Sequence, residues 1–273
     1  MELNKNSRLI QGTWLIEKDK MAFEALDYGI KRGLKVIDTA EMYGDGKSEE
    51  LVGKVISKYK RDEIYLISKV YPYNSNKKRM RIELINSLNR LKIDYLDLYL
   101  LHWRGDIELS ETVEAFEELK KEGLIKNWGV SNFDVSDMEE LISVKNGENC
   151  YCNQVLYNII SRGIEFDLIP WMKEKNIKLM IYSPLGHNDI IREKVLTNKT
   201  IKELAKTKKN TVYQLMLTFV LRNKDLYVVT KSSSTHHIEA NIECLDINLT
   251  DKEIKRIDKE FIPPKSKIIL EEI

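Results

Sequence analysis

Short apolar runs alternate with amphipathic stretches along almost the whole chain. Apolar positions spaced three and four residues apart, such as Leu51, Val52, Val55 and Ile56, indicate a helix with one buried face. The short, mostly apolar runs between such stretches are typical of strands buried on both faces, as in a parallel sheet. The pattern predicts eight strands, at residues 9–14, 34–37, 64–68, 95–101, 125–130, 151–155, 177–181 and 226–229.

Helices are predicted between these strands, and several carry start or stop signals. Ser48 is expected to cap the helix after the second strand. Ser136 and Glu139 are expected to form the capping box of the helix that precedes the sixth strand. Gly123 is a typical stop for the helix that opens at Ser110. The helix before the fourth strand should have a buried face formed by Ile82, Ile85, Leu88 and Leu91. Further helices are expected near residues 21–30, 166–175, 199–207, 211–222 and 251–259.

This strict alternation predicts an α/β protein with a single (β/α)8 TIM barrel domain spanning residues 1–273. No linker, low-complexity segment or fixed repeat interrupts it. The helix near residues 251–259 would be an extra C-terminal element, and the loops on the carboxyl face should be short. A doubly wound open sheet is the structural alternative, but no Gly-x-Gly-x-x-Gly run follows any predicted strand.

Composition narrows the class of protein further. Lys and Arg number 44 against 43 Asp and Glu, so a net charge of +1 gives no general attraction to nucleic acid or membranes. The chain has three cysteines, and such a small, odd number argues against a secreted disulfide framework. Cys150 and Cys152 could form half of a metal site, but no second ligand pair lies at a useful distance. We therefore expect a cytoplasmic protein without bound metal, and without a nucleic-acid or membrane partner. We also expect it to be a monomer.

Polar side chains follow seven of the predicted strands at their carboxyl ends. In a (β/α)8 barrel these ends converge on one face, where barrel enzymes carry their active sites. A single charge in such a place can simply be solvated, whereas the whole set predicts a site in the barrel mouth. The residues are Asp38, Lys69, His102 with Trp103, Ser131 with Asn132, Asn153 with Gln154, Tyr182 with Ser183, and Lys231 with Ser232.

Proton transfer by Tyr43, in the loop after the second strand, is the chemistry that this set favours. A tyrosine has a pKa near 10 and is a sluggish acid at neutral pH. A lysine ammonium about 4 Å away favours the phenolate by about 4 kcal/mol at an effective dielectric constant near 20. Lys69 is thus predicted to lower the pKa of Tyr43 by about three, into the range of a general acid. Asp38 would keep Lys69 protonated, and His102 would hydrogen-bond a substrate oxygen.

Several sequence blocks, in the same order along the chain, resemble those of the aldo-keto reductases. The resemblance runs from residue 12 to about residue 241. It implies hydride transfer from a nicotinamide cofactor to an aldehyde or ketone, with Tyr43 protonating the oxygen and Asp38, Lys69 and His102 completing a tetrad. The blocks are residues 38–49 (DTAEMYGDGKSE), 68–70 (SKV), 101–103 (LHW), 129–133 (GVSNF), 153–154 (NQ) and 182–186 (YSPLG).

The resemblance also implies the contacts to cofactor and substrate. Ser131, Asn132 and Gln154 would hold the nicotinamide carboxamide, and the ring of Tyr182 would stack on the nicotinamide. The substrate pocket would be lined by Trp14, Tyr43, His102 and Trp103. Further cofactor contacts are implied for Thr13, Trp14, Asp38, Ser183, Leu185, Lys231, Ser232, Ser234, His237 and Asn241.

The chain departs from the family pattern near the adenosine end of the cofactor. The family commonly carries an arginine that grips the 2′-phosphate of NADPH, and here His237 takes its place. Lys231 and Ser234 still offer a charge and a hydroxyl, so NADPH is the expected cofactor, with NADH as an alternative. The segments at residues 104–109 and 187–194 and the tail after residue 264 are short, which predicts an open, permissive pocket.

Other functions fit the same residues less well. Gly46-Lys47-Ser48 resembles the end of a phosphate loop, but Glu41 stands where that loop needs a glycine. A barrel glycosidase needs carboxylates on opposite sides of the mouth, whereas Asp38 and Glu41 share one loop. A cofactor-binding regulatory subunit with low turnover is the alternative from another class, although the complete tetrad favours an enzyme.

Overall fold

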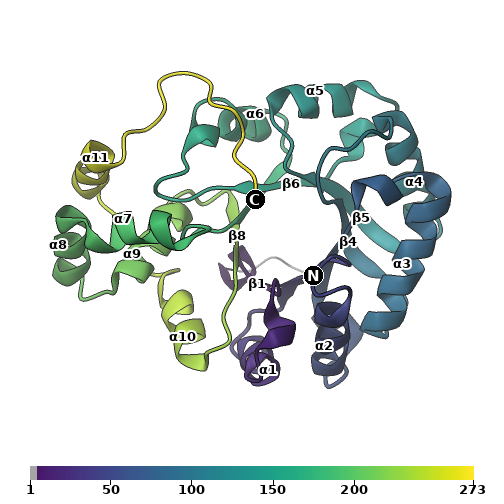
Figure 1. Cartoon of the computed structure of the whole chain (residues 1–273), viewed down its shortest axis with the longest axis horizontal. Coiled ribbons are helices and arrows are strands. Elements are labelled where there is room, and N and C mark those ends of the chain that lie inside the picture. The colour runs from purple at the N-terminus through teal and green to yellow at the C-terminus, as the bar shows by residue number, and fades with distance from the viewer. Residues whose placement is uncertain (1–4) are drawn as a thin grey trace.

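The computed structural model describes residues 5–273, in which parallel strands close into a barrel. Each strand pairs with its neighbours in chain order, and the last pairs with the first (Figure 1). This confirms the predicted (β/α)8 barrel. The strands are β1 (Leu9–Gly12), β2 (Val36–Asp38), β3 (Tyr65–Val70), β4 (Leu96–Leu101), β5 (Ile125–Ser131), β6 (Cys152–Leu156), β7 (Lys178–Tyr182) and β8 (Leu226–Thr230).

The α-helices surround the barrel as an outer ring (Figure 1). They are α1 (Ala22–Lys31), α2 (Lys47–Ile56), α3 (Lys77–Leu91), α4 (Leu109–Lys121), α5 (Val135–Ser143), α6 (Leu168–Glu174), α7 (Asp189–Thr197), α8 (Lys199–Thr207), α9 (Val212–Leu221), α10 (Thr235–Glu243) and α11 (Asp251–Glu260). The sequence pattern did not predict α7 or α10, and α11 is the predicted extra helix. Within the described part of the chain, no helix is long and apolar enough to cross a membrane.

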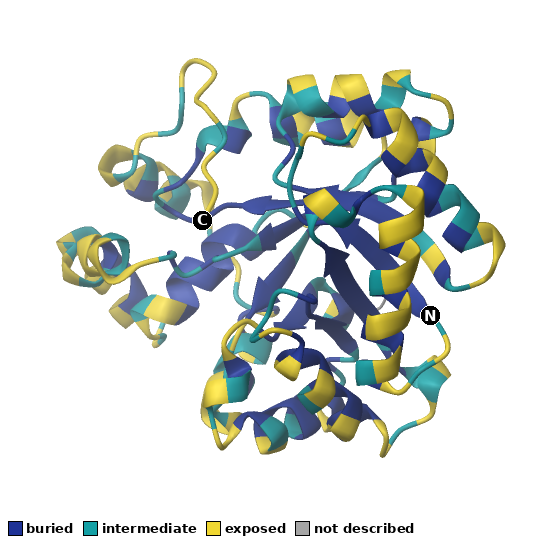
Figure 2. Cartoon of the chain, turned by 45° about the vertical axis from the view of Figure 1, so that its right-hand side comes forward, coloured by how far each residue is buried: buried dark blue, intermediate teal, exposed yellow. Residues whose placement is uncertain are grey.

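The strands are buried on both faces because apolar side chains alternate between two cores. Ile67 belongs to a small cluster, contributed almost entirely by strand residues, that fills the barrel, while its neighbour Leu66 belongs to the larger cluster that includes the helices. Figure 2 shows the same division, with buried strands inside and helices whose outer faces are exposed. Two layers of packing therefore hold the carboxyl ends of the strands in a fixed ring.

The predicted inward face of α3 is wrong in its first turns. Ile82 is 49% exposed and Ile85 is 37% exposed, whereas Met80 and Leu84 are buried with Leu88 and Leu91. Met80 and Leu84 continue the row of Leu88 and Leu91 at spacings of four and three, so they share their face. Ile82 and Ile85 lie beside this row on the solvent side.

Two predicted helix caps are also wrong. The capping box of α5 is formed by Asp134 and Asp137, and Ser136 instead donates a hydrogen bond to the carboxylate of Asp134. A carboxylate accepts the orphan amide hydrogen bond and also favours the positive end of the helix dipole. Helix α2 follows Gly46, and Ser48 lies within its first turn, where its hydroxyl donates to the carbonyl of Thr13 at 3.1 Å.

Candidate active site

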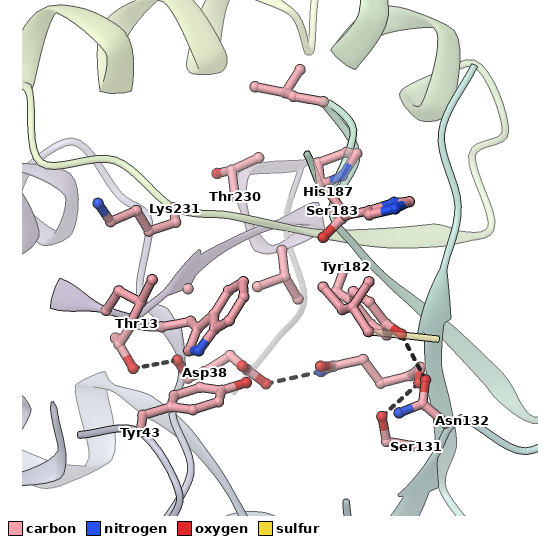
Figure 3. Close-up of a pocket in the computed structure, with 18 of the residues that line it drawn as sticks. Thr13, Asp38, Tyr43, Ser131, Asn132, Tyr182, Ser183, His187, Thr230 and Lys231 are labelled. Atoms are coloured by element: carbon pink, nitrogen blue, oxygen red, sulfur yellow. Dashed lines mark hydrogen bonds between the residues drawn. The ribbon is translucent and has the colours of Figure 1, made fainter. Parts of the chain in front are cut away.

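A cavity of about 320 Å³ lies at the carboxyl ends of the strands (Figure 3). Most of the predicted site residues line it, from seven of the strands or from the loops after them. They are Thr13, Trp14, Asp38, Tyr43, His102, Trp103, Ser131, Asn132, Gln154, Tyr182, Ser183, Leu185 and Lys231. Of the other predicted residues, Lys69 is buried behind the lining. Ser232, Ser234, His237 and Asn241 are outside the lining.

The side chain of Lys69 connects the carboxylate of Asp38 and the phenol of Tyr43 in the predicted tetrad. Its Nζ is buried and donates to Asp38 Oδ1 at 2.6 Å, to the carbonyl of Thr39 at 3.0 Å and to Tyr43 Oη at 3.0 Å. An ammonium group has three hydrogens and no acceptor, so these contacts use all of them. The oxygen of Tyr43 is therefore the acceptor from Lys69, and its own hydrogen is left to point elsewhere.

The predicted low pKa of Tyr43 is wrong for this structure. Burial raises the pKa of Tyr43 more than the charge and hydrogen bond of Lys69 lower it, and the charge of Asp38 raises it further. The sequence shows the charge of Lys69 but not the extent of burial, and burying a phenolate is costly. Burial alone would lower the pKa of Lys69, but Asp38 and Tyr43 outweigh it and raise that pKa. The site therefore holds a cationic lysine and a protonated tyrosine at neutral pH.

His102 is neutral and has a free ring nitrogen. Burial, together with the nearby charge of Lys69, holds its pKa well below the usual range. Its Nδ1 is buried and has no hydrogen-bond partner among the described residues. The ring meets the ring of Tyr43 edge to face at 5.8 Å between centroids. A neutral imidazole beside the phenol can hydrogen-bond a ligand oxygen without adding charge to the site.

Amide and hydroxyl side chains form a hydrogen-bonded group on the opposite side of the close-up from Tyr43 (Figure 3). Gln154 Nε2 donates to the second carboxylate oxygen of Asp38 at 2.8 Å, and Ser131 Oγ donates to the backbone carbonyl of Gln154 at 2.7 Å. Tyr182 Oη donates to Asn132 Oδ1 at 2.8 Å. These bonds fix donors and acceptors at the edge of the cavity, next to the exposed part of the Tyr182 ring.

Aromatic side chains form an apolar wall on the outer part of the cavity. Trp14 lines it and is 45% exposed, and Trp103 lies against His102 with 4.9 Å between ring centroids. Trp103 also meets Tyr71, from the loop after β3, edge to face at 5.8 Å. Such a wall favours a ligand with an apolar body, and the family resemblance implied that Trp14 and Trp103 would line the substrate pocket.

Sequence reasoning missed lining residues from two segments. The segment at residues 187–194, predicted to be short and open, contains the start of α7, from which Arg192 reaches the cavity. Ile273 lines it from the tail, which crosses from α11 back to the mouth (Figure 1). Glu271 accepts a hydrogen bond from Ser161 Oγ at 2.6 Å, which ties the tail down. The pocket therefore has a wall, formed by α7 and the tail, that the prediction of an open pocket did not include. The apolar residues near the end of the sequence were the available signal that the tail packs against the barrel.

Of the predicted adenosine-end residues, Lys231 lines the cavity, whereas the others lie on the loop after β8 and on α10, outside the cavity lining. Ser232 Oγ donates to the carbonyl of Ser234 at 3.1 Å, so it supports the local turn. His237 is exposed in the first turn of α10. Their contact with a cofactor stays a prediction.

Comparisons with known proteins agree with this geometry. Residues 8–260 match the model of the Aldo/keto reductase family. The chain is 40% identical over 265 residues to the methylglyoxal reductase YeaE of Escherichia coli, covering 96% of this chain and 93% of that protein. It is 34% identical to a glyoxal reductase of Bacillus subtilis over 250 residues, which cover 90% of this chain and 86% of that relative.

Solved structures give the same result. The fold is similar to that of an aldo/keto reductase from Klebsiella pneumoniae in complex with NADP and acetate, with a TM-score of 0.94 and 43% identity. The similarity covers 97% of this chain and 95% of that one. A second structure of an aldo-keto reductase from that organism, in complex with NADPH, matches equally well. The resemblance found in the sequence blocks is confirmed, and this chain belongs to the aldo/keto reductase family.

Proposed function

We propose that this protein is an NADPH-dependent reductase that converts small aldehydes and ketones to alcohols, with Tyr43 as the proton donor. The main support for this proposal is the set of three hydrogen bonds that Lys69 donates. Because Lys69 uses its hydrogens on Asp38, Thr39 and Tyr43, the phenol keeps its own hydrogen for a group in the cavity. A bound carbonyl oxygen next to His102 is the acceptor that this arrangement suits.

The residues present fit a nicotinamide cofactor. Asn132 and Gln154 bring amide groups to the cavity edge, as a carboxamide ligand needs, and Tyr182 offers an aromatic ring beside them. The buried Nδ1 of His187 has no partner among the described residues, and Lys231 adds a cation. NADPH would supply the hydride when bound. The two Klebsiella complexes with NADP and NADPH support this choice, and NADH is the alternative.

Each tetrad residue has a separate task in the proposed reaction. Tyr43, protonated at neutral pH because burial raises its pKa, donates its proton to the substrate oxygen. Lys69 then stabilises the phenolate that remains, and Asp38 balances the lysine charge. Neutral His102 orients the carbonyl through a ring nitrogen. In alcohol oxidation the same groups act in reverse, with the phenolate as the base.

The substrate is proposed to be small because the cavity must also hold the nicotinamide end of the cofactor. The cavity measures about 320 Å³, near the lower limit for ligand pockets. Trp14, Trp103 and Ile273 close its outer part with apolar surface. The names of the relatives, methylglyoxal reductase and glyoxal reductase, support short aldehydes with a neighbouring carbonyl as the first candidates.

Turnover of the purified protein tests this proposal. NADPH oxidation should accelerate when methylglyoxal, glyoxal or a simple aldehyde is added, and the alcohol should appear in equal amount. Tight NADPH binding without turnover of any compound in a broad aldehyde and ketone panel would instead support the regulatory-subunit alternative. Failure to bind NADPH or NADH would contradict both.

We also propose that the enzyme acts as a monomer in the cytoplasm. The hydrogen bonds from Lys69 to Asp38 and Tyr43 join the proposed catalytic groups within a single chain, so a monomer can carry out the proposed reaction. Cys150, Cys152 and Cys244 are free and buried, as suits a reducing compartment. Light scattering of the purified protein should give the mass of one chain, and a stable dimer would contradict the monomer.

A further inference from the structure

The part of the cavity wall that the tail (residues 261–273) contributes depends on contacts made outside the cavity. The tail leaves α11 and returns to the barrel mouth (Figure 1), and its described residues form no helix or strand. Ile262 and Ile269 of the tail are exposed, whereas Ile273 lines the cavity. A segment without regular secondary structure takes its position from the residues that it contacts.

Arg162, in the loop after β6, holds the point where the tail begins. Its side chain is buried, and Nη1 donates to Asp258 in the last turn of α11 at 2.8 Å and to the carbonyl of Phe261 at 2.6 Å. The last carbonyls of a helix lack partners within the helix and carry partial negative charge, so a cation suits them. Arg162 therefore fixes both the end of α11 and the first residue of the tail.

A second carboxylate keeps this guanidinium in place. Glu165 accepts hydrogen bonds from Arg162 Nε at 3.1 Å and from Arg162 Nη2 at 2.7 Å. The same carboxylate accepts from Tyr157 and from Arg222 Nη2 at 2.9 Å. A two-point contact of this kind fixes the plane of a guanidinium and so the direction of its remaining donors. The loop after β6 thus presents Nη1 of Arg162 to α11 in a defined direction.

Ser161 holds the other end of the tail. Its Oγ donates to Glu271 at 2.6 Å, two residues before Ile273. A further ion pair, between Lys267 and Asp134 at 3.2 Å, is partly exposed and contributes little. A cavity of about 20 Å³ lies between the tail and the loop after β6, so packing there is incomplete. The polar contacts of the loop are therefore the main restraints on the tail.

We propose that Arg162 and Ser161 are positioning residues, which hold the tail so that Ile273 forms part of the substrate wall. The inference rests on the proposed function and explains how residues outside the cavity set its substrate range. With the tail in place, the wall encloses a small carbonyl compound. With the tail displaced, the cavity opens and admits a bulkier one. The tail is not part of the tetrad, so the effect falls on substrate discrimination and not on the chemical step.

Steady-state reduction of methylglyoxal and phenylglyoxal measures this discrimination, because the two compounds share the reacting group and differ in the size of the body. Arg162→Met should raise the ratio of kcat/KM for phenylglyoxal to that for methylglyoxal by about fivefold or more, mainly through KM. Ser161→Ala should change the ratio in the same direction. Arg162→Lys, which keeps a cation near the carbonyl of Phe261, should recover part of the change.

Arg222→Met is the matched control for Arg162→Met. Arg222 donates to the same carboxylate of Glu165, and its other hydrogen bonds within the described residues go to Tyr157 and Phe219, not to α11 or the tail. The variant therefore disturbs the same cluster without releasing the tail. It should change the ratio by less than about twofold.

A double-mutant cycle separates positioning from a general loss of stability. Ile273→Ala removes the wall contact and leaves the restraints on the tail intact, so it should change the ratio as Arg162→Met does. If Arg162 acts through Ile273, the variant with both substitutions should match the single variants. Effects that multiply in the double variant would show that Arg162 acts elsewhere and would overturn the inference.

Other results would also overturn it. They are an unchanged ratio in both Arg162→Met and Ser161→Ala, and a large change in the dissociation constant of NADPH, which calorimetry should show to be nearly constant. Circular dichroism shows whether each variant is folded, and Ser161→Ala with Arg162→Lys decides the question if Arg162→Met is not. A wild type that reduces neither compound would instead contradict the proposed function.

Discussion

Glu41, in the loop between β2 and Tyr43, is a buried carboxyl whose charge should destabilise the fold. It is 7% exposed, and its Oε1 accepts a hydrogen bond from the backbone amide of Tyr71 at 2.7 Å. Its Oε2 is buried and has no hydrogen-bond partner among the described residues. Burial raises the pKa of Glu41 from 4.5 to about 7, and the charges of Glu83 and Glu49 add to the effect. The neutral form is therefore the one that the folded protein accommodates.

The direction of the pH effect follows from which state binds the proton. Between the unfolded pKa of 4.5 and the folded pKa of about 7, the folded protein holds a proton on Glu41 that the unfolded chain has lost. The stabilisation is complete below pH 4.5 and is lost as the pH rises through about 7. At 1.36 kcal/mol per pKa unit, this difference is worth about 3 kcal/mol. Glu41→Gln stays neutral at every pH and avoids the loss.

Urea unfolding of the wild type and Glu41→Gln, from pH 4.5 to pH 8.5, measures this difference. The free energy of unfolding of Glu41→Gln relative to the wild type should increase by about 3 kcal/mol across the range, mostly before pH 7. Glu50→Gln, at an exposed position of α2, is the control and should show no such trend. A constant difference between wild type and Glu41→Gln would refute the reasoning.

Three further variants test other contacts of the structure. Lys69→Met removes the cation that stabilises the phenolate, so kcat should fall by about 10²-fold or more, while NADPH binding measured by calorimetry should change far less. A kcat equal to that of the wild type would contradict the role of Lys69. His102→Gln should lower kcat/KM for methylglyoxal by about tenfold or more, because a neutral hydrogen-bonding ring is lost, and an unchanged value would exclude it from the site. Arg90→Met leaves the buried carboxylate of Glu49 without the Nε donor at 2.6 Å, and urea unfolding should show a loss of about 3–5 kcal/mol. A loss below 1 kcal/mol would mean that water or another group compensates.

Much of the barrel could be predicted because its strands are buried on both faces and its helices on one. An apolar run such as that ending at Ile37, followed at once by Asp38, gives both the strand and its carboxyl end. The face of α3 could not be fixed in the same way, since Ile82 and Ile85 are as apolar as Met80 and Leu84. Only the packing of the helix against its neighbours decides which row is buried.

The site residues also differ in whether the sequence alone could predict them. Residues at strand ends, such as Lys69 and His102, were predicted because the barrel geometry itself brings them together. Arg192 and Ile273 were missed because α7 and the tail reach the mouth through tertiary packing, which leaves little trace in local sequence. The pKa of Tyr43 was predicted in the wrong direction for a related reason: a charge pair can be read from sequence, but the extent of burial cannot.

The central claim is that Tyr43 donates the proton, and Tyr43→Phe tests it most directly. Single-turnover reduction of methylglyoxal by bound NADPH compares the chemical step in wild type and variant, with cofactor affinity followed by quenching of tryptophan fluorescence. If Tyr43 donates the proton, the rate of Tyr43→Phe should be lower by about 10²-fold to 10⁴-fold, as for loss of a general acid, with the dissociation constant of NADPH nearly unchanged. A variant that reduces methylglyoxal at the wild-type rate would contradict it.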